Sequence, residues 1–292
     1  MKKAEPFSPV GLSGAMRAWL IVNPASGSVT ETHSIDALAA ETAIELVRTT
    51  IFPDEPLPRA DDLATERIEL LILFAGDGTI NAAACALDGW GGRVLVLPGG
   101  TMNMLAKQLH GSADPKAIVA RAAADPAPEA IPLPFVEAGP HRAFVAMIAG
   151  PPAAWAHARE AVRKGRLQAA WRAARIAWTR SFAGGVRLRG TPRDRRHRAV
   201  VAIPDPGGME IAAIDVDGWI GAVRLGLEWL AGDWRTSPAV TIMTPDAASI
   251  EGGRAIHLLF DGESVKLPGP LRVSHGMTRL GFIRTIGSED EQ

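Results

Sequence analysis

Three apolar segments in the first half of the chain each run directly into a loop of glycine and small polar residues. The segments are 18–22, 69–74 and 93–97, and the loops are 23–28, 75–79 and 98–103. Short apolar runs that alternate with helical stretches are typical of parallel strands buried on both faces of a sheet. Loops that follow parallel strands gather at the carboxyl edge of the sheet, where open α/β sheets bind ligands. This pattern predicts an α/β fold with a parallel sheet.

The other elements are predicted from periodicity and turn residues. In the first half we expect a further strand at 47–52, a turn at 76–78, and helices at 34–48, 62–68, 79–87 and 102–110. The proline-rich stretch 125–134 marks a linker. Beyond it, short apolar or alternating runs indicate an antiparallel β domain, interrupted by a helical segment at 153–180. These runs are 143–148, 199–203, 239–243, 255–260 and 279–285.

Length and composition set the class of protein. At about 150 residues per domain, the 292 residues suggest two domains. With 47% hydrophobic and 22% charged residues, the composition is that of a globular protein and excludes a disordered chain. The stretch 143–156 is too short for a membrane span, residues 1–19 lack a signal-peptide pattern, and the lone Cys85 cannot form an internal disulfide. We therefore expect a cytoplasmic protein.

The formal net charge of −1 conceals an asymmetry. The segment 157–198 carries thirteen basic residues and two acidic ones, so the rest of the chain is acidic. Such a concentration of charge suggests an anionic partner, which could be a nucleotide, an acidic lipid or a nucleic acid. The other interpretation is a solvated helix face followed by a basic loop.

The three glycine loops have the composition of a phosphate site. Glycines let the backbone approach a phosphate closely, and amides at the start of the following helix point towards it. The side chains of Ser26, Thr79, Thr101 and Asn103 add donors. The chain has neither the G-x-x-x-x-G-K-[ST] motif of P-loop kinases nor a G-x-G-x-x-G dinucleotide fingerprint.

Asp77, between two glycines, places a carboxylate on this phosphate-facing turn. A carboxylate repels phosphate unless a cation lies between them, and Mg²⁺ takes one or two carboxylates together with phosphate oxygens. The residue is therefore a candidate metal ligand. The alternative is a turn aspartate that makes a local hydrogen bond.

The loops, in this order, resemble the catalytic domain of the diacylglycerol kinase family, which includes bacterial diacylglycerol and lipid kinases, sphingosine kinases and ceramide kinases. The matching motifs are Asn23-Pro24-Ala25-Ser26-Gly27, Ala75-Gly76-Asp77-Gly78-Thr79 with Asn81, Pro98-Gly99-Gly100-Thr101-Met102-Asn103-Met104, and Asp261-Gly262-Glu263, with an earlier Asp217-Gly218. The resemblance spans residues 18 to about 285.

This resemblance implies two domains with the active site in the cleft. A nucleotide-binding domain similar to those of phosphofructokinase and NAD kinase would occupy 16–128. A β-sandwich-like lipid-substrate domain would occupy 129–278, and 279–292 would return to the first domain. The family transfers the γ-phosphoryl group of ATP to a lipid hydroxyl, so ATP, Mg²⁺ and a membrane lipid are the implied cofactors and substrate.

The resemblance also assigns site residues. The nucleotide phosphates would be held by Asn23, Ser26, Gly27, Gly76, Gly78, Thr79, Gly100, Thr101 and Asn103, with Thr49 as a looser candidate. Asp77 would organise Mg²⁺ or help to deprotonate the acceptor. Glu263 would be the general base, and Asp261 would lie beside the metal or orient its loop.

Three positions depart from the family pattern. Ala75 replaces the first glycine of G-G-D-G-T, Ala82 stands where a glutamate is frequent, and Met104 replaces the aspartate of N-D. The last two changes remove acids from the nucleotide side of the site. They leave open a weak enzyme, a nucleotide- or lipid-binding regulator, or a soluble-metabolite kinase of the NAD kinase type.

Diacylglycerol is the default acceptor, and ceramide or a sphingoid base is the alternative. Contact with the inner face of the membrane would be peripheral and transient, through the basic segment 157–198. Leu167, Trp171 and Trp178 in that segment would face the lipid or pack into the second domain. Nucleic acid is not an expected partner, and a homodimer is left open.

Overall fold

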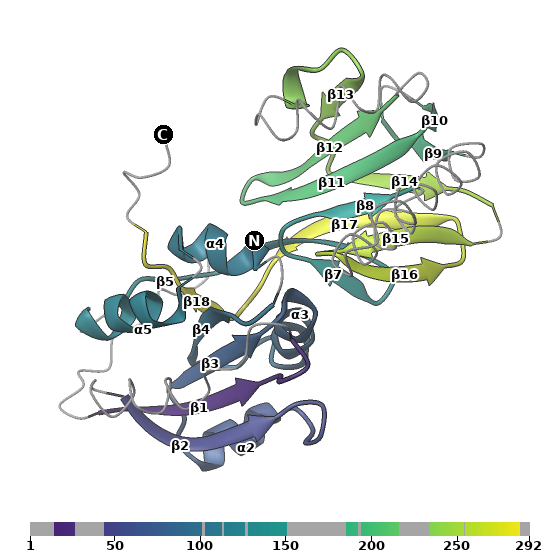
Figure 1. The fold of residues 1–292 in the computed structure, drawn as a ribbon. Coiled ribbons are helices and arrows are strands. Elements are labelled where there is room, and N and C mark those ends of the chain that lie inside the picture. Colours follow the sequence, from purple (N-terminus) through teal and green to yellow (C-terminus); the bar gives the residue numbers. More distant parts are fainter. Residues whose placement is uncertain are drawn as a thin grey trace, which may run out of the picture. The chain divides into compact units, whose positions relative to one another are not determined.

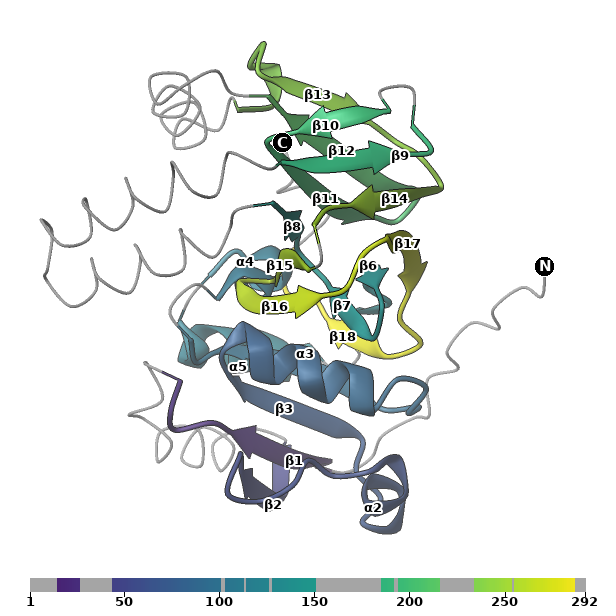
Figure 2. The same cartoon turned by 90° about the vertical axis from the view of Figure 1, so that its right-hand side faces the viewer.

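The computed structural model describes residues 15–26, 44–100, 103–112, 114–125, 128–150, 185–191, 194–215, 234–253 and 255–286. The chain divides into two units, one comprising residues up to Pro132 and again from Thr278, the other Leu133–Met277 (Figures 1 and 2). Several predictions lie outside the described residues. They concern the helices at 34–43 and 153–180, most of the basic segment, Gly27, Thr101 and Asp217-Gly218.

The first unit is built on a six-stranded sheet with the order β2-β1-β3-β4-β18-β5. The neighbours from β2 to β18 are parallel, and β5 is antiparallel to β18. The strands are β1 (Met16–Val22), β2 (Ile44–Ile51), β3 (Leu70–Ala75), β4 (Arg93–Pro98), β18 (Gly281–Ile283) and β5 (Ala130–Ile131). Every residue of β3 is buried, as a central strand requires. The α/β class predicted from the sequence is confirmed.

Within the described part of this unit, four helices accompany the sheet: α2 (Ala60–Thr65), α3 (Asp77–Ala86), α4 (Met104–His110) and α5 (Pro115–Ala124). One core cluster joins the buried strand residues to Ile118, Val119 and Ala122 of α5. The sequence analysis missed α5, although its start carries a clear signal. Asp114 accepts a hydrogen bond from the Lys116 amide, and Pro115 occupies the first turn.

Two local predictions in this unit were wrong. Residues 44–48 belong to β2 and not to a helix, because they pair with Met16 to Trp19 of β1. The apolar residues of this segment fit either period, and the neighbouring strand decides between them. The expected turn at 76–78 is the start of α3, with Gly76 as its N-cap and Asp77 as its first residue.

The second unit consists of two six-stranded antiparallel sheets. The first has the order β10-β9-β14-β17-β6-β7, with bounds Arg195–His197, Val186–Arg189, Ala247–Glu251, Leu271–Met277, Pro134–Ala138 and His141–Ala143. The second has the order β13-β12-β11-β8-β15-β16, with bounds Val240–Met243, Gly208–Ile214, Ala199–Asp205, Met147–Ala149, Ile256–Phe260 and Glu263–Leu267. A 3-10 turn, η1 (Trp234–Thr236), precedes β13. One buried cluster takes residues from both sheets.

Three segments differ from the expected positions. The predicted strand 143–148 is interrupted, because β7 ends at Ala143 and β8 begins at Met147. The run 279–285 was grouped with the β domain by its pattern, but it supplies β18 beside β4 in the first sheet, in line with the return to the first domain that the resemblance implied. Residues 130–131, which were expected in the second domain, form β5 beside β18. None of the described helices is long and apolar enough to cross a membrane.

Candidate active site

The loop after β1 is hydrogen-bonded to the loop after β3. The side-chain amide of Asn23 donates to Thr79 Oγ1 at 2.8 Å, and its Oδ1 accepts from the Ala25 amide at 3.0 Å. The hydroxyl of Ser26 accepts from the Gly76 amide at 3.1 Å. Parallel pairing of β1 with β3 brings these two strand ends together. Four of the predicted phosphate-site residues, Asn23, Ser26, Gly76 and Thr79, are therefore neighbours in the first unit.

The loop after β4 lies directly against the loop after β3. The Gly99 amide donates to the Ala75 carbonyl at 3.1 Å. A Cβ on Gly100 would lie 2.7 Å from the Cα of Gly76, and a Cβ on Gly99 would lie 2.7 Å from the Ala75 nitrogen. Real side chains do not tolerate such distances to backbone atoms, so glycine at 99 and 100 is required by the close approach of the two loops.

Asn103 closes the third loop in a left-handed conformation, with φ 50° and ψ 43°. Asparagine is one of the few non-glycine residues that adopt this region readily. Its Oδ1 accepts from the Gly100 amide at 2.7 Å, so the side chain folds back onto its own loop. The residue is also the N-cap of α4, but its side chain does not cap the helix.

Asp77 supplies the acceptor that α4 lacks. Its Oδ2 accepts from the Met104 amide at 3.3 Å, and its Oδ1 accepts from the Leu105 amide at 3.4 Å. Both distances are long for hydrogen bonds, and the carboxylate also lies near the positive end of the α4 dipole. These bonds are not the local turn contact that was considered as the alternative, because their donors lie 27 and 28 residues further along the chain. Met104 stands where the family motif has an aspartate, and the backbone amide of Met104 donates to Asp77.

These loops together form a site rich in hydrogen-bond donors, in which Asp77 is the one charged residue among the described loop residues. The N-terminus of α3 begins inside it, and the hydroxyls of Ser26 and Thr79 each accept one bond from the cluster and retain a proton that can be donated. Among the described loop residues 23–26, 75–79, 98–100 and 103, none is lysine or arginine. Helix-terminal amides and hydroxyls of this kind suit phosphate oxygens.

Thr49 is less closely connected with this cluster. It lies in the edge strand β2, opposite Leu20 of β1 and two residues before the strand ends. The neighbouring Thr50 is the buried threonine, and its hydroxyl accepts from Trp19 Nε1 at 2.9 Å. Gly78 lies in the first turn of α3 and is half-buried.

In the second unit, Asp261 and Gly262 form the two-residue turn of the β15–β16 hairpin. Their φ angles are 48° and 93°, and Phe260 pairs with Glu263 across the turn. Two consecutive positive φ angles are typical of a type I′ turn, for which Asp-Gly is a favoured sequence. Glu263 begins β16 and is exposed.

Asp261 is only 7% exposed, and its carboxylate binds three consecutive backbone amides. Its Oδ2 accepts from Phe144 at 2.8 Å, and its Oδ1 accepts from Val145 at 2.9 Å and Ala146 at 3.0 Å. The Asp261 amide returns a bond to the Ala146 carbonyl at 3.1 Å. This carboxylate holds the loop between β7 and β8.

The sequence analysis missed the partners of Asp261. No side-chain motif marks residues 144–146, because they act through backbone amides.

The predicted site residues fall into two groups: the glycine loops and Asp77 belong to the first unit, and Asp261 and Glu263 belong to the second. Within the described residues, no group of three or more His, Cys, Asp or Glu side chains could hold a metal ion.

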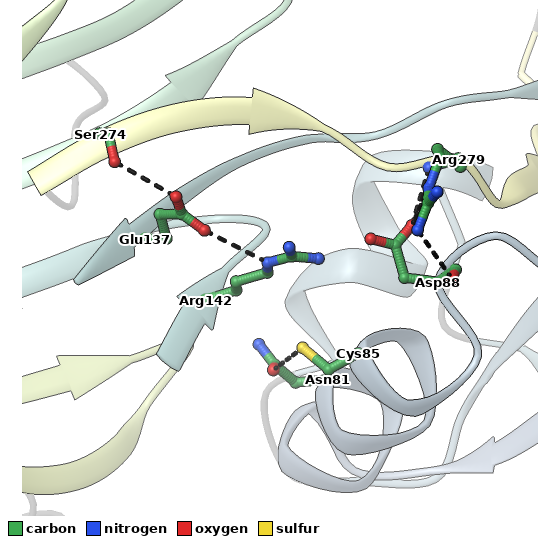
Figure 3. A network of polar contacts seen from close by, with 7 residues as sticks. All are labelled: Asn81, Cys85, Asp88, Glu137, Arg142, Ser274 and Arg279. Atoms are coloured by element: carbon green, nitrogen blue, oxygen red, sulfur yellow. Dashed lines mark hydrogen bonds and ion pairs between the residues drawn. The ribbon is translucent and has the colours of Figure 1, made fainter. Parts of the chain in front are cut away.

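Figure 3 includes polar contacts of Asn81, Cys85, Asp88 and Arg279 in the first unit. Asp88, just after α3, accepts from the Arg279 amide at 3.0 Å through Oδ1, and its carbonyl accepts from Arg279 Nη2 at 3.3 Å. Cys85 Sγ lies 3.5 Å from Asn81 Oδ1 within α3. The end of α3 is thereby joined to the segment that leads into β18.

His110, the last residue of α4, is fully buried beneath this region. Its Nδ1 lies 3.0 Å from Thr285 Oγ1. Burial lowers the pKa of His110 from 6.5 to about 4; a hydrogen bond with the Val96 backbone opposes this shift, and the charge of Arg121 reinforces it. The imidazole is therefore neutral at pH 7 and serves the packing of α4.

Comparison with known proteins agrees with this architecture. Residues 17–131 match the family model of the diacylglycerol kinase catalytic domain. No protein with a curated description matches the chain in sequence. Two solved structures from Bacillus anthracis str. Sterne, each described as a putative diacylglycerol kinase, have TM-scores of 0.62 and 0.63 at 18% and 17% identity. A third from the same organism, described as a diacylglycerol kinase, has a TM-score of 0.58 at 14% identity.

These alignments cover 92% of this chain and 96% or 97% of the other chains. At such identities the likeness establishes a shared fold. The family model covers all three loops, including Asn23, Asp77 and Asn103. Residues 17–131 therefore match the diacylglycerol kinase catalytic domain, and the chain shares its fold with the three solved structures.

Proposed function

We propose that this protein is an ATP-dependent lipid kinase that transfers the γ-phosphoryl group of ATP to the hydroxyl of a diacylglycerol-like lipid. The observation that carries the proposal is the cluster of three hydrogen-bonded loops at the carboxyl ends of β1, β3 and β4, within the residues that match the catalytic-domain model. The match to a kinase catalytic domain implies ATP as the phosphoryl donor.

The loops of the first unit would hold the nucleotide phosphates. Ser26 and Thr79 would donate their hydroxyl protons, and the amides at the start of α3 would face phosphate oxygens. Asp77 is the carboxylate that would bind Mg²⁺ together with those oxygens, a ligand set that this metal accepts. When bound, Mg²⁺ neutralises the charge that phosphoryl transfer develops. Asp77 is the only acidic residue among the described loop residues 23–26, 75–79, 98–100 and 103.

Glu263 is the candidate general base. It is an exposed carboxylate at the start of β16, directly after a rigid two-residue turn. Phosphoryl transfer needs positioning and one group that takes the hydroxyl proton of the acceptor. Asp261 is assigned a positioning role, because its carboxylate is bound to the amides of Phe144, Val145 and Ala146.

The lipid identity rests on the family and on the descriptions of the similar structures, which name diacylglycerol kinases. A lipid substrate further requires peripheral contact with a membrane surface. Diacylglycerol is the proposed acceptor, and ceramide and sphingosine are the competing acceptors that an experiment must include.

The test is transfer of labelled phosphate from ATP with Mg²⁺ to diacylglycerol, ceramide or sphingosine in mixed micelles, with a no-lipid control. Wild type is expected to label diacylglycerol. Asp77→Asn and Glu263→Gln are each expected to lower kcat at least 100-fold while the far-UV circular dichroism stays unchanged. Labelling of a soluble acceptor without lipid, or nucleotide binding without any transfer, would refute the proposal.

A further inference from the structure

Asn103, at the junction between the third loop and α4, has a backbone conformation that few non-glycine residues adopt. Its φ and ψ angles are 50° and 43°, in the left-handed region that glycine and asparagine tolerate best. The residue is also only 9% exposed. A buried residue keeps such a conformation where its surroundings hold it, and positions of this kind concentrate at functional sites. The contacts of Asn103 therefore indicate what the conformation is for.

The side chain of Asn103 holds the third loop against the start of α3. Its Oδ1 accepts from the Gly100 amide at 2.7 Å. Gly100 in turn lies so close to Gly76 that a Cβ on Gly100 would be 2.7 Å from the Gly76 Cα. Gly76 is the N-cap of α3, and Asp77 is the first residue of that helix. The hydrogen bond from Gly100 to Asn103 therefore helps to fix the third loop beside Asp77.

The main chain of Asn103 fixes the start of α4. Its carbonyl accepts from the Lys107 amide at 3.0 Å. The next two amides, of Met104 and Leu105, donate to Asp77 at 3.3 Å and 3.4 Å. Both bonds are at the long limit of hydrogen-bond geometry, so a small displacement of the first turn of α4 would break them. The left-handed conformation of Asn103 sets the direction of that turn.

These contacts form a closed circuit within the first unit. The circuit runs through Asn103, Gly100, Gly76, Asp77 and Met104. We infer that Asn103 is a positioning residue that couples the third loop to Asp77, and that its side chain does not bind the phosphate. The inference deepens the proposed function, on which it rests for ATP as the ligand. The coupling itself follows from the contacts alone.

A phosphate ligand would use Asn103 differently. Its NH₂ group would have to donate to a phosphate oxygen, since Oδ1 is an acceptor. In the structure the side chain is folded onto its own loop through Oδ1, and the residue is nearly buried. Aspartate separates the two roles. It tolerates the left-handed region and keeps an acceptor for the Gly100 amide, but it has no NH₂ group and carries a negative charge.

Amide hydrogen exchange of the full chain, at residue resolution, measures the coupling. Asn103→Gly keeps the backbone conformation accessible and removes Oδ1. Exchange of the Met104 and Leu105 amides should become about tenfold faster, which is the effect of one lost hydrogen bond on a local opening. Coupling is reciprocal, so Asp77→Asn should speed exchange of the Gly100 amide by about the same factor. Unchanged exchange at either end of the circuit would overturn the inference.

Asn23→Gly is the matched control. It makes the same replacement in the loop after β1, where the side chain contacts Thr79 and the Ala25 amide. It should leave exchange of the two α4 amides at the wild-type rate. Equal acceleration by Asn23→Gly and Asn103→Gly would mean that any loosened loop has this effect, and would overturn the inference.

Calorimetric titration with ATP and Mg²⁺ distinguishes positioning from phosphate binding. Asn103→Gly should weaken ATP binding about tenfold. Asn103→Asp should restore ATP binding to within about threefold of wild type and exchange of the α4 amides to the wild-type rate. If Asn103→Asp binds ATP more weakly than Asn103→Gly, the NH₂ group serves the phosphate and the inference is overturned. If Asn103→Gly does not fold, a loss of more than about tenfold in Asn103→Asp has the same meaning.

The two measurements separate this inference from the proposed function. If wild type binds no ATP, the proposed function fails, and the exchange rates still decide whether Asn103 and Asp77 are coupled. If wild type binds ATP and phosphorylates a lipid while the α4 amides of Asn103→Gly exchange at the wild-type rate, only the positioning role fails.

Discussion

Replacing Asp261 with asparagine tests whether one buried carboxylate organises the β7–β8 loop. Asparagine keeps the size of the side chain and tolerates the positive φ of 48°. Its single oxygen can keep the bonds from Val145 and Ala146, which both reach Oδ1. Its NH₂ group would then face the Phe144 amide, where Oδ2 now accepts at 2.8 Å. Two donors would oppose each other at a buried position.

The expected cost follows from these three bonds. A hydrogen bond to a charged group contributes about 1.5–3 kcal/mol, and a buried donor left unsatisfied costs about 1–3 kcal/mol. Losing one bond and weakening two should lower the free energy of unfolding by about 2–4 kcal/mol. In a unit of this size, each kcal/mol lowers the Tm by about 2–4 °C. Asp261→Asn should therefore melt roughly 4–16 °C below wild type.

Thermal and urea unfolding followed by circular dichroism measure this effect. Glu263→Gln is the matched control: it makes the same chemical change two residues away, on an exposed side chain, and should change stability by less than about 0.5 kcal/mol. Asp261→Gly removes the carboxylate but permits the turn, and should be at least as destabilising as asparagine. Equal melting of Asp261→Asn and Glu263→Gln would refute the reasoning.

Three further predictions concern the first unit. Gly100→Ala should abolish ATP binding in a calorimetric titration, because its Cβ would meet Gly76 Cα at 2.7 Å, while Gly91→Ala, with open space around it, should bind normally. His110 is neutral when folded, with a pKa of about 4 against 6.5 unfolded, so its contribution to stability is complete above about pH 6.5 and is lost as the pH falls towards 4. Urea unfolding should show a loss of about 2 kcal/mol between pH 7 and pH 5 that is absent in His110→Gln. Trp19→Phe removes the 2.9 Å bond to Thr50 and weakens the stacking of Arg48, and should cost about 1–2 kcal/mol in the same assay.

Much of the first unit could be read from the sequence because its signals are local. The segments that form β3 and β4 are almost wholly apolar. Strands of this composition are typical of the middle of a parallel sheet, where both faces are buried. The glycine loops follow from the same pattern, since parallel strand ends must meet at one edge. Local pattern failed at 44–48, where helix and strand periods both fit and pairing with β1 decided the outcome.

What the sequence by itself determined is that polar loops follow the parallel strands of the first unit and that an Asp-Gly-Glu turn lies near the end of the chain. Only the tertiary structure decided what surrounds them. Asp77 accepts from Met104 and Leu105, far along the chain, and Asp261 accepts from three backbone amides more than a hundred residues away. Arg272 joins Arg189 through a shared neighbour on β14. Backbone donors are identical in every non-proline residue, and strand register depends on pairing across long separations, so neither leaves a mark in local sequence.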